Sequence, residues 1–244
     1  MKIIRLITIA LLLTVTNTVL AQYDDKGYYQ PGYGNRNFAN NASYNNFYSD
    51  DEEGWGTIYA SYSPMQLVST AKGVDNKLFH TATIGFQYDF QLGESPAYFG
   101  AAFETSGAWF SKTYEDGEKY SMDLYYAKLP VNLSFRVNIT EGLDFVPSAG
   151  VFVKWNISCR EQEKYNGVTT TYNVFDSDYT YDDDYNRFQF GYQAGLNLII
   201  ANCLSVGAAW KADITSFCTY YDSFTRSEEK EKFRGVSFSL GYCF

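Results

Sequence analysis

From about Trp55 to the C-terminus, apolar and polar residues alternate along the chain with a period of two. In the clearest stretch, Thr81 to Leu92, one set of alternate positions is apolar and the other is polar or glycine. This period indicates β-strands, and the length suits a tilted strand of about 9–11 residues that crosses a membrane. The pattern predicts strands near residues 55–65, 78–92, 96–110, 121–139, 143–157, 186–200, 203–216 and 233–244.

The connections between these strands are alternately short and long. GESP, TEG and little more than Asn202 join the second to the third, the fourth to the fifth and the sixth to the seventh strand. The longest connection runs from Ser158 to about Tyr185. In an up-and-down membrane barrel, short turns lie on the periplasmic side and long loops outside the cell. We therefore predict an all-β fold over residues 55–244: an eight-stranded antiparallel up-and-down transmembrane β-barrel.

The polar face of the strands combines charged residues with many glycines and serines, as expected for a narrow lumen rather than an open outer surface. A buried arginine without a partner is costly. Arg136 and Asp144 have the same parity across the TEG turn, and Glu104 and Lys128 lie at similar heights on neighbouring strands. Both are predicted lumen ion pairs. Side chains just fill an eight-stranded interior, which argues against a diffusion pore.

The apolar face ends in aromatic residues, which make up 19% of the chain. A membrane barrel carries such rings in two girdles at the membrane interfaces. The alternative is a secreted, soluble, lipocalin-like barrel, in which the apolar face points inward around an apolar ligand. The girdle residues are Trp109, Tyr125 and Trp155 on the loop side and Phe90, Phe99, Tyr242 and Phe244 on the turn side.

The N-terminal residues differ from the barrel region. Lys2, Arg5 and the apolar run 7–15 predict a signal peptide over residues 1–21, cleaved after Ala21. Residues 22–54 are rich in Tyr, Asn and Gly and predict a flexible periplasmic tail. The net charge of −9 makes a nucleic-acid partner unfavourable.

Three segments resemble a known family. The terminal strand GVSFSLGYCF resembles the C-terminal signal that barrel-assembly machinery recognises, which assigns that role to Tyr242 and Phe244. YYAKLPVNLSFRV and VPSAGVFVKW resemble two successive strands of the PorT-like outer-membrane β-barrel family, which is abundant in Bacteroidota. The resemblance spans roughly residues 55–244 and implies the fold and location in the cell outer membrane. The family includes a secretion accessory component, so that role is also open.

Candidate chemistry is sparse. Eight-stranded lipid A deacylases resemble this architecture and use a His with a Ser two residues later. Here His80 is followed by Ala82, so the nucleophile is missing. The acidic loop around Asp176–Asp184 lacks EF-hand spacing, and with one histidine and no CxxC a metal site is not expected. We expect no catalytic residue, no cofactor and no metal.

The four cysteines lie in a chain bound for an oxidising compartment, where disulfides are permitted. Cys203 and Cys243 share lumen parity at the turn-side rim, so a Cys203–Cys243 disulfide is geometrically plausible. Cys159 and Cys218 have the opposite parity at the outer rim and form a second candidate pair. Free thiols are the alternative.

The function expected from these observations is a non-enzymatic outer-membrane barrel that displays extracellular loops. Its role is surface interaction, envelope integrity or assistance to a secretion complex. The expected partners are outer-membrane lipid and lipopolysaccharide, barrel-assembly machinery during insertion and a protein at the loops. The alternatives are the soluble barrel described above and, third, a lipid-modifying enzyme of the outer membrane.

Overall fold

The computed structural model describes residues 54–71, 76–93, 95–114, 117–140, 142–175, 184–222 and 227–244. The predicted signal peptide and the predicted tail, apart from Gly54, lie outside these residues. Within them there is no helix long and apolar enough to cross a membrane.

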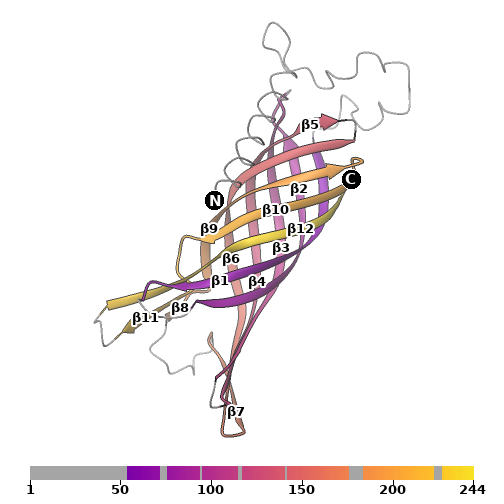
Figure 1. Cartoon of the computed structure of the whole chain (residues 1–244). Coiled ribbons are helices and arrows are strands. Elements are labelled where there is room, and N and C mark those ends of the chain that lie inside the picture. Colours follow the sequence, from indigo (N-terminus) through magenta and orange to yellow (C-terminus); the bar gives the residue numbers. More distant parts are fainter. Residues whose placement is uncertain are drawn as a thin grey trace, which may run out of the picture.

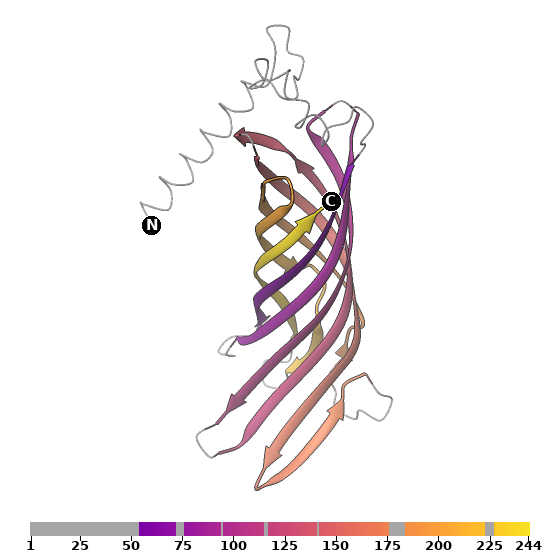
Figure 2. The same cartoon turned by 90° about the vertical axis from the view of Figure 1, so that its right-hand side faces the viewer.

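Eight long strands close into an antiparallel barrel, which confirms the predicted fold class (Figures 1 and 2). The hydrogen-bonded order is β1-β2-β3-β4-β6-β9-β10-β12, and β12 pairs back onto β1 through contacts such as Thr57 opposite Cys243. The barrel strands are β1 (Gly54–Ser69), β2 (Lys77–Gln91), β3 (Ala97–Thr113), β4 (Lys119–Phe135), β6 (Leu143–Tyr165), β9 (Phe188–Ile200), β10 (Leu204–Asp213) and β12 (Ser227–Cys243).

Four short strands add to this barrel. β5 (Val137–Thr140) continues β4 past Arg136 and pairs with β6 at the turn-side end. β7 (Val168–Asn173) pairs with β6, whereas β11 (Cys218–Asp222) pairs with both β12 and β8 (Asp184–Tyr185). On the loop side the barrel therefore continues into two sheets that project in different directions (Figure 1). We call β3–β4–β6–β7 the long extension and β8–β11–β12 the short extension.

The turns at the opposite end are short, as the spacing predicted. The turn between β9 and β10 has Ala201 and Asn202 in the left-handed region, with φ of 51° and 58°. Two successive positive φ angles define a type I′ turn, whose twist matches that of the flanking antiparallel strands. Cys203 N donates to Ile200 O across it at 3.2 Å. Ala201 is an uncommon residue for such a backbone, because its Cβ disfavours positive φ.

The prediction of a loop from Ser158 to about Tyr185 was wrong for the first half of that range. β6 continues to Tyr165, and Asn166 and Gly167, with φ of 50° and 81°, make a two-residue turn into β7. Asn-Gly between alternating residues is a strong short-range hairpin signal, and it stands in the sequence as YNGV. Residues 176–183, which include most of the acidic residues of this connection, lie outside the described part of the chain.

The outer wall is apolar and the interior is polar. Large apolar side chains point outward, with exposed fractions of 68% for Ile84, 55% for Leu129 and 58% for Val151 and Leu240. The residues between them face inward and include many buried polar groups, such as Thr83, Asn132 and Ser237. An outward apolar wall has to be covered by lipid, so the soluble lipocalin-like alternative was wrong.

A cluster of buried apolar side chains fills the loop-side end of the barrel. Phe79 and Phe217 are fully buried at its centre and contact Phe233 in T-shaped and tilted arrangements, with ring centroids 5.1 and 5.2 Å away. We call this cluster the apolar cap: Met65, Leu67, Phe79, Ala108, Met122, Leu124, Cys159, Val174, Phe217, Cys218 and Phe233. The cap separates the polar lumen below it from the solvent on the loop side.

A β-bulge changes which residues enter the cap. Tyr126 pairs with Asn156 but Tyr125 pairs with Ser158, so Ile157 is an extra residue on β6. One inserted residue moves every later side chain to the opposite face. Cys159, predicted on the lipid side, therefore points inward and is fully buried.

Candidate functional site

The centre of the lumen holds a charge cluster around Glu104 of β3. Lys128 Nζ lies 2.5 Å from Glu104 Oε2, and Lys211 Nζ lies 3.5 Å from Oε1. The Tyr59 hydroxyl donates to Oε1 at 2.8 Å. The structure thus brings together the predicted pair Glu104 and Lys128 and adds a second lysine from across the barrel.

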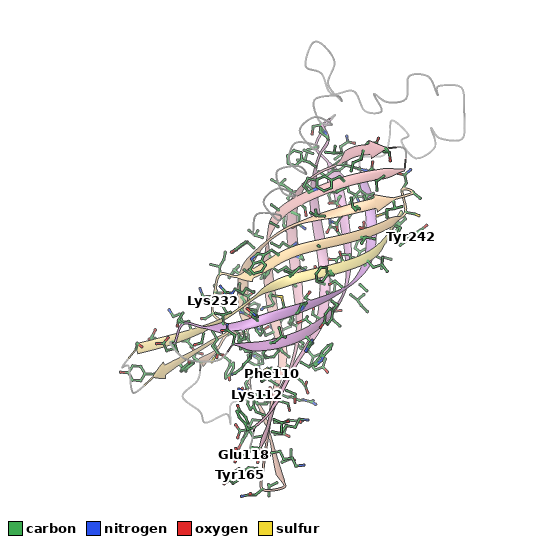
Figure 3. The ribbon with its side chains drawn as sticks, viewed as in Figure 1. Phe110, Lys112, Glu118, Tyr165, Lys232 and Tyr242 are labelled. Atoms are coloured by element: carbon green, nitrogen blue, oxygen red, sulfur yellow. The ribbon has the colours of Figure 1, made fainter. Side chains whose placement is uncertain are left out.

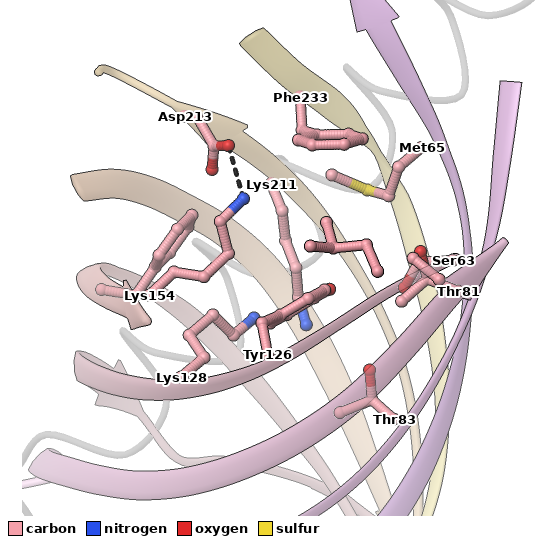
Figure 4. A pocket seen from close by; sticks show the side chains of 13 residues that line it. Ser63, Met65, Thr81, Thr83, Tyr126, Lys128, Lys154, Lys211, Asp213 and Phe233 are labelled. Atoms are coloured by element: carbon pink, nitrogen blue, oxygen red, sulfur yellow. Dashed lines mark hydrogen bonds and ion pairs between the residues drawn. The ribbon is translucent and has the colours of Figure 1, made fainter. Parts of the chain in front are cut away.

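A second cluster lies beside it. Lys154 Nζ donates to Asp213 Oδ2 at 2.6 Å (Figure 4). Gln189 Nε2 donates to the same oxygen at 2.8 Å. Asn156 Nδ2 in turn donates to Gln189 Oε1 at 2.8 Å. Lys128 and Lys154 are direct cross-strand neighbours of the same sign. Two lysines can share this position because each has its own carboxylate.

The third cluster closes the turn-side end. Arg136 Nε and Nη2 both donate to Asp144 Oδ2, at 2.8 and 2.6 Å, so the second predicted pair is also in contact. Asn138 Nδ2 donates to the other carboxylate oxygen at 2.8 Å. The guanidinium lies over the ring of Trp55, 4.9 Å from its centroid. Asp144 is fully buried, so this bonding replaces the water that its carboxylate has lost.

The free space in the lumen is small. A cavity of about 20 Å³ lies between the charge clusters and the apolar cap, bounded by Ser63, Thr81 and Phe233 (Figure 4). A larger one of about 90 Å³ lies toward the turns, which is room for a few waters. The oxygens of Ser61, Ser134 and Gln193 that line it have no protein partner among the described residues. Buried polar oxygens of this kind are the groups that structural water bonds to in proteins.

Sequence reasoning missed the contacts that cross the barrel. Lys154, Lys211 and Asp213 stand at polar positions of the period-two pattern, but the pattern gives them no partners. Lys154 and Asp213 lie on strands separated by β9, and Glu104 and Lys211 on opposite walls. Turn lengths give the register of neighbouring strands only, so no local signal predicts these pairs.

His80 lies on the outer wall near the loop side. Its Nδ1 shares a hydrogen bond of 2.6 Å with the Tyr62 hydroxyl, and its ring lies between those of Tyr62 and Trp109, at 6.1 and 6.2 Å. The next outward residue on this strand is Ala82. The imidazole is thus part of an aromatic row and has no hydroxyl nucleophile at the position that a His-Ser pair requires.

All four cysteines are free thiols. Cys243 N donates to Cys203 O at 2.6 Å, so the two main chains are adjacent, but no disulfide joins them. Cys243 Sγ lies 3.5 Å from Thr57 Oγ1, whereas Cys203 Sγ points to the Ile200 carbonyl. The predicted Cys203–Cys243 bridge is absent here because Cys203 sits in the turn, with its sulfur directed elsewhere. Cys159 and Cys218 share the apolar cap without a bond.

The long extension has a buried acid of its own. Glu161 Oε1 accepts hydrogen bonds from Tyr120 and Tyr185, at 2.9 and 2.8 Å. Burial and the Glu161 carboxylate raise the pKa of the Tyr185 hydroxyl far above its usual range, so it remains a donor. These bonds tie β8 to β4 and β6. Within the described residues, no three acid, His or Cys side chains gather in a way that could hold a metal ion.

Several solved structures are similar to this chain. Ail of Yersinia pestis, in complex with a heparin analogue, is 12% identical, with a TM-score of 0.44 over 79% of this chain and 100% of its own. OprG of Pseudomonas aeruginosa is 10% identical, with a TM-score of 0.43 over 79% and 97%. The outer membrane enzyme PagL is 11% identical, with a TM-score of 0.41 over 76% and 97%. No curated protein matches the sequence.

The family assignment comes from the sequence match. Residues 38–227 match the model of the outer membrane protein beta-barrel domain, a range that includes most of the strands described above. Membership in such a family implies an outer-membrane location. The chain therefore belongs to the outer membrane protein beta-barrel domain family and is a protein of the outer membrane.

Proposed function

We propose that this protein is a closed, non-enzymatic barrel whose function is to bind another protein at the cell surface through the long extension. The observation that carries the proposal is β7, the edge strand of that extension. Among the described residues it pairs only with β6. Its sequence VTTTYN has no charge and no proline, and Val168 is 67% exposed.

An uncharged, exposed edge strand is unusual. Proteins commonly protect sheet edges with lysines, prolines or bulges, because unpaired N–H and C=O groups recruit other chains. β7 has none of these features, and its threonines and tyrosine have high β propensity. An extended segment of a partner adds to such an edge through main-chain hydrogen bonds. The hydrogen bonds of Glu161 stiffen the base of the extension and hold this edge in place.

The lumen supports the non-enzymatic part of the proposal. Its charged groups bond to one another beneath the apolar cap, and His80 bonds to Tyr62. The lipid-modifying alternative rests on His80, and His80→Ala tests it: loss of any activity on lipid A would favour an enzyme. The strand resemblance of residues 125–137 supports a place in the PorT-like group. Export through a signal peptide, with the extensions outside the cell, belongs to the same proposal.

The test is site-specific photo-crosslinking in intact cells. A photoreactive amino acid replaces Thr170 in β7 or, as the matched control, Tyr221 in the short extension, which is 59% exposed. We expect a discrete protein adduct from position 170 and none from position 221. The adduct should disappear when Thr169 and Thr171 are both changed to Lys, because charges on the edge oppose strand addition. Absence of an adduct at 170, or equal adducts at both positions, would contradict the proposal.

A further inference from the structure

The loop-side half of β12 separates its charges by face. In the stretch EEKEKFR, Glu229, Glu231 and Phe233 point inward and are buried, with 9%, 8% and 4% of their surfaces exposed. The residues between them, Lys230, Lys232 and Arg234, point outward. Lys230 and Arg234 are exposed and Lys232 is half-buried. We call these three outward side chains the basic stripe.

The inward acids already have partners. Glu229 accepts hydrogen bonds from Thr70 and Ser227, at 2.6 and 2.8 Å, and Glu231 lies 3.8 Å from Lys77 Nζ. No described carboxylate forms an ion pair with the basic stripe; Lys232 Nζ donates to the carbonyl of Ile214 instead. In a chain with a net charge of −9, three cations in a row on the outer wall remain available to an external anion.

The height of the basic stripe relative to the membrane interface bears on which anion it meets. Arg234 lies opposite Ala212 of β10, and the next outward pair toward the turns is Trp210 with Val236. Trp210 is 44% exposed on the outer wall and marks the membrane interface. At ~3.3 Å per residue along a strand tilted by ~45°, Arg234 stands about 5 Å above that level and Lys230 about 14 Å. The headgroup layer extends about 5–8 Å beyond the hydrocarbon core on each side, so Arg234 lies at the height of lipid phosphates and the lysines lie above it.

We infer that the basic stripe on β12 is a binding site for the phosphate groups of outer-leaflet lipid A. Arg234 is placed to bind one phosphate through two parallel N–H donors, and the lysines act as point charges above it. The side chains follow one strand and face away from the barrel, so a lipid lying against the wall reaches all three. Figure 3 shows Lys232 at the loop-side end of β12 and Tyr242 at its opposite end. The site rests on the proposed orientation, with the extensions outside the cell, but it is independent of β7 and of the proposed protein partner.

The test compares lipid A that carries both phosphates with enzymatically dephosphorylated lipid A. Affinity for the purified barrel in neutral detergent is measured by native mass spectrometry and by fluorescence competition at about 0.15 M salt. A basic residue near an anionic lipid surface contributes about fivefold in affinity. The variant K230Q/K232Q/R234Q should therefore lose about 100-fold in affinity for the phosphorylated lipid and change little for the other.

The matched control is K112Q/K119Q/K164Q, which removes three exposed lysines from the long extension. Figure 3 labels Lys112. It should bind phosphorylated lipid A as the unchanged protein does. Equal losses in both variants, or no loss in the stripe variant, would overturn the inference. Binding of an acidic peptide, polyglutamate, in place of the lipid would assign the stripe to a protein instead. If the triple variant does not fold, R234Q alone decides, with about a fivefold loss expected.

Discussion

Removing the charge of Glu104 should destabilise the barrel more than any surface substitution. Glu104→Gln keeps the shape of the side chain but leaves Lys128 and Lys211 without their shared carboxylate. The side chains of Glu104, Lys128 and Lys211 are only 3%, 5% and 11% exposed, so bulk water has little access to these charges. Breaking a buried ion pair from one side costs roughly 3–5 kcal/mol. That corresponds to roughly two to four orders of magnitude in the folding equilibrium.

The measurement is reversible urea unfolding of the barrel in lipid vesicles, followed by tryptophan fluorescence. A second variant, Glu104→Gln with Lys128→Met, removes one of the two unpaired cations. It should recover at least about 1 kcal/mol, because neighbouring substitutions in one network couple. The exposed acid Glu163 provides the control, and Glu163→Gln should stay within about 0.5 kcal/mol of the unchanged protein. A cost below about 1 kcal/mol for Glu104→Gln would show that water in the lumen screens these charges as at a surface, and would refute the reasoning.

Three further predictions follow from closure of the barrel, from the turn between β9 and β10, and from the apolar cap. Unboiled protein should run faster than boiled protein on an SDS gel, because a closed barrel has every strand edge paired; a single band at both temperatures would exclude closure. Ala201→Gly should stabilise the barrel by about 1 kcal/mol in the urea assay, since Ala201 has φ of 51°; a loss of stability would show that this backbone is not strained. Cys159 is fully buried, so a membrane-impermeant maleimide should label its thiol only after the barrel unfolds. Deletion of the bulge residue Ile157 should turn Cys159 outward and make the thiol reactive in the folded state.

Much of the barrel follows from local patterns. The eight predicted ranges each correspond to a barrel strand, and the largest boundary differences lie on the loop side, where β6 and β12 run past the predicted ends. Loop-side segments such as EEKEKFR are charged on both faces, so the apolar alternation that marks a strand in lipid is lost there. The hairpin at Asn166–Gly167 did have a signal, which the composition of the surrounding residues obscured.

The ion pairs of the lumen also divide into those that local patterns predict and those that they do not. Arg136 with Asp144 and Glu104 with Lys128 join neighbouring strands, and a short turn or a direct cross-strand position relates their residues. Lys211 and Asp213 find their partners across strands that are not neighbours, which requires the closed barrel. Cys159 shows where counting alternate positions fails. The extra residue Ile157 moves each later side chain of β6 to the opposite face of the strand, and hydrophobicity alone does not locate such a bulge.

The sequence by itself determined that the chain forms membrane-spanning strands with one apolar and one polar face, and that short turns collect at one end. Those properties depend on side-chain type and spacing within about fifteen residues, which is the range over which a strand acts. Only the tertiary structure decided which charges meet inside, that an apolar cap closes the loop side, and that a neutral edge strand and a basic stripe lie on different faces outside. The contacts inside depend on closure of β12 onto β1, which brings together residues far apart in the chain. The cap also depends on the bulge in β6, which turns Cys159 inward.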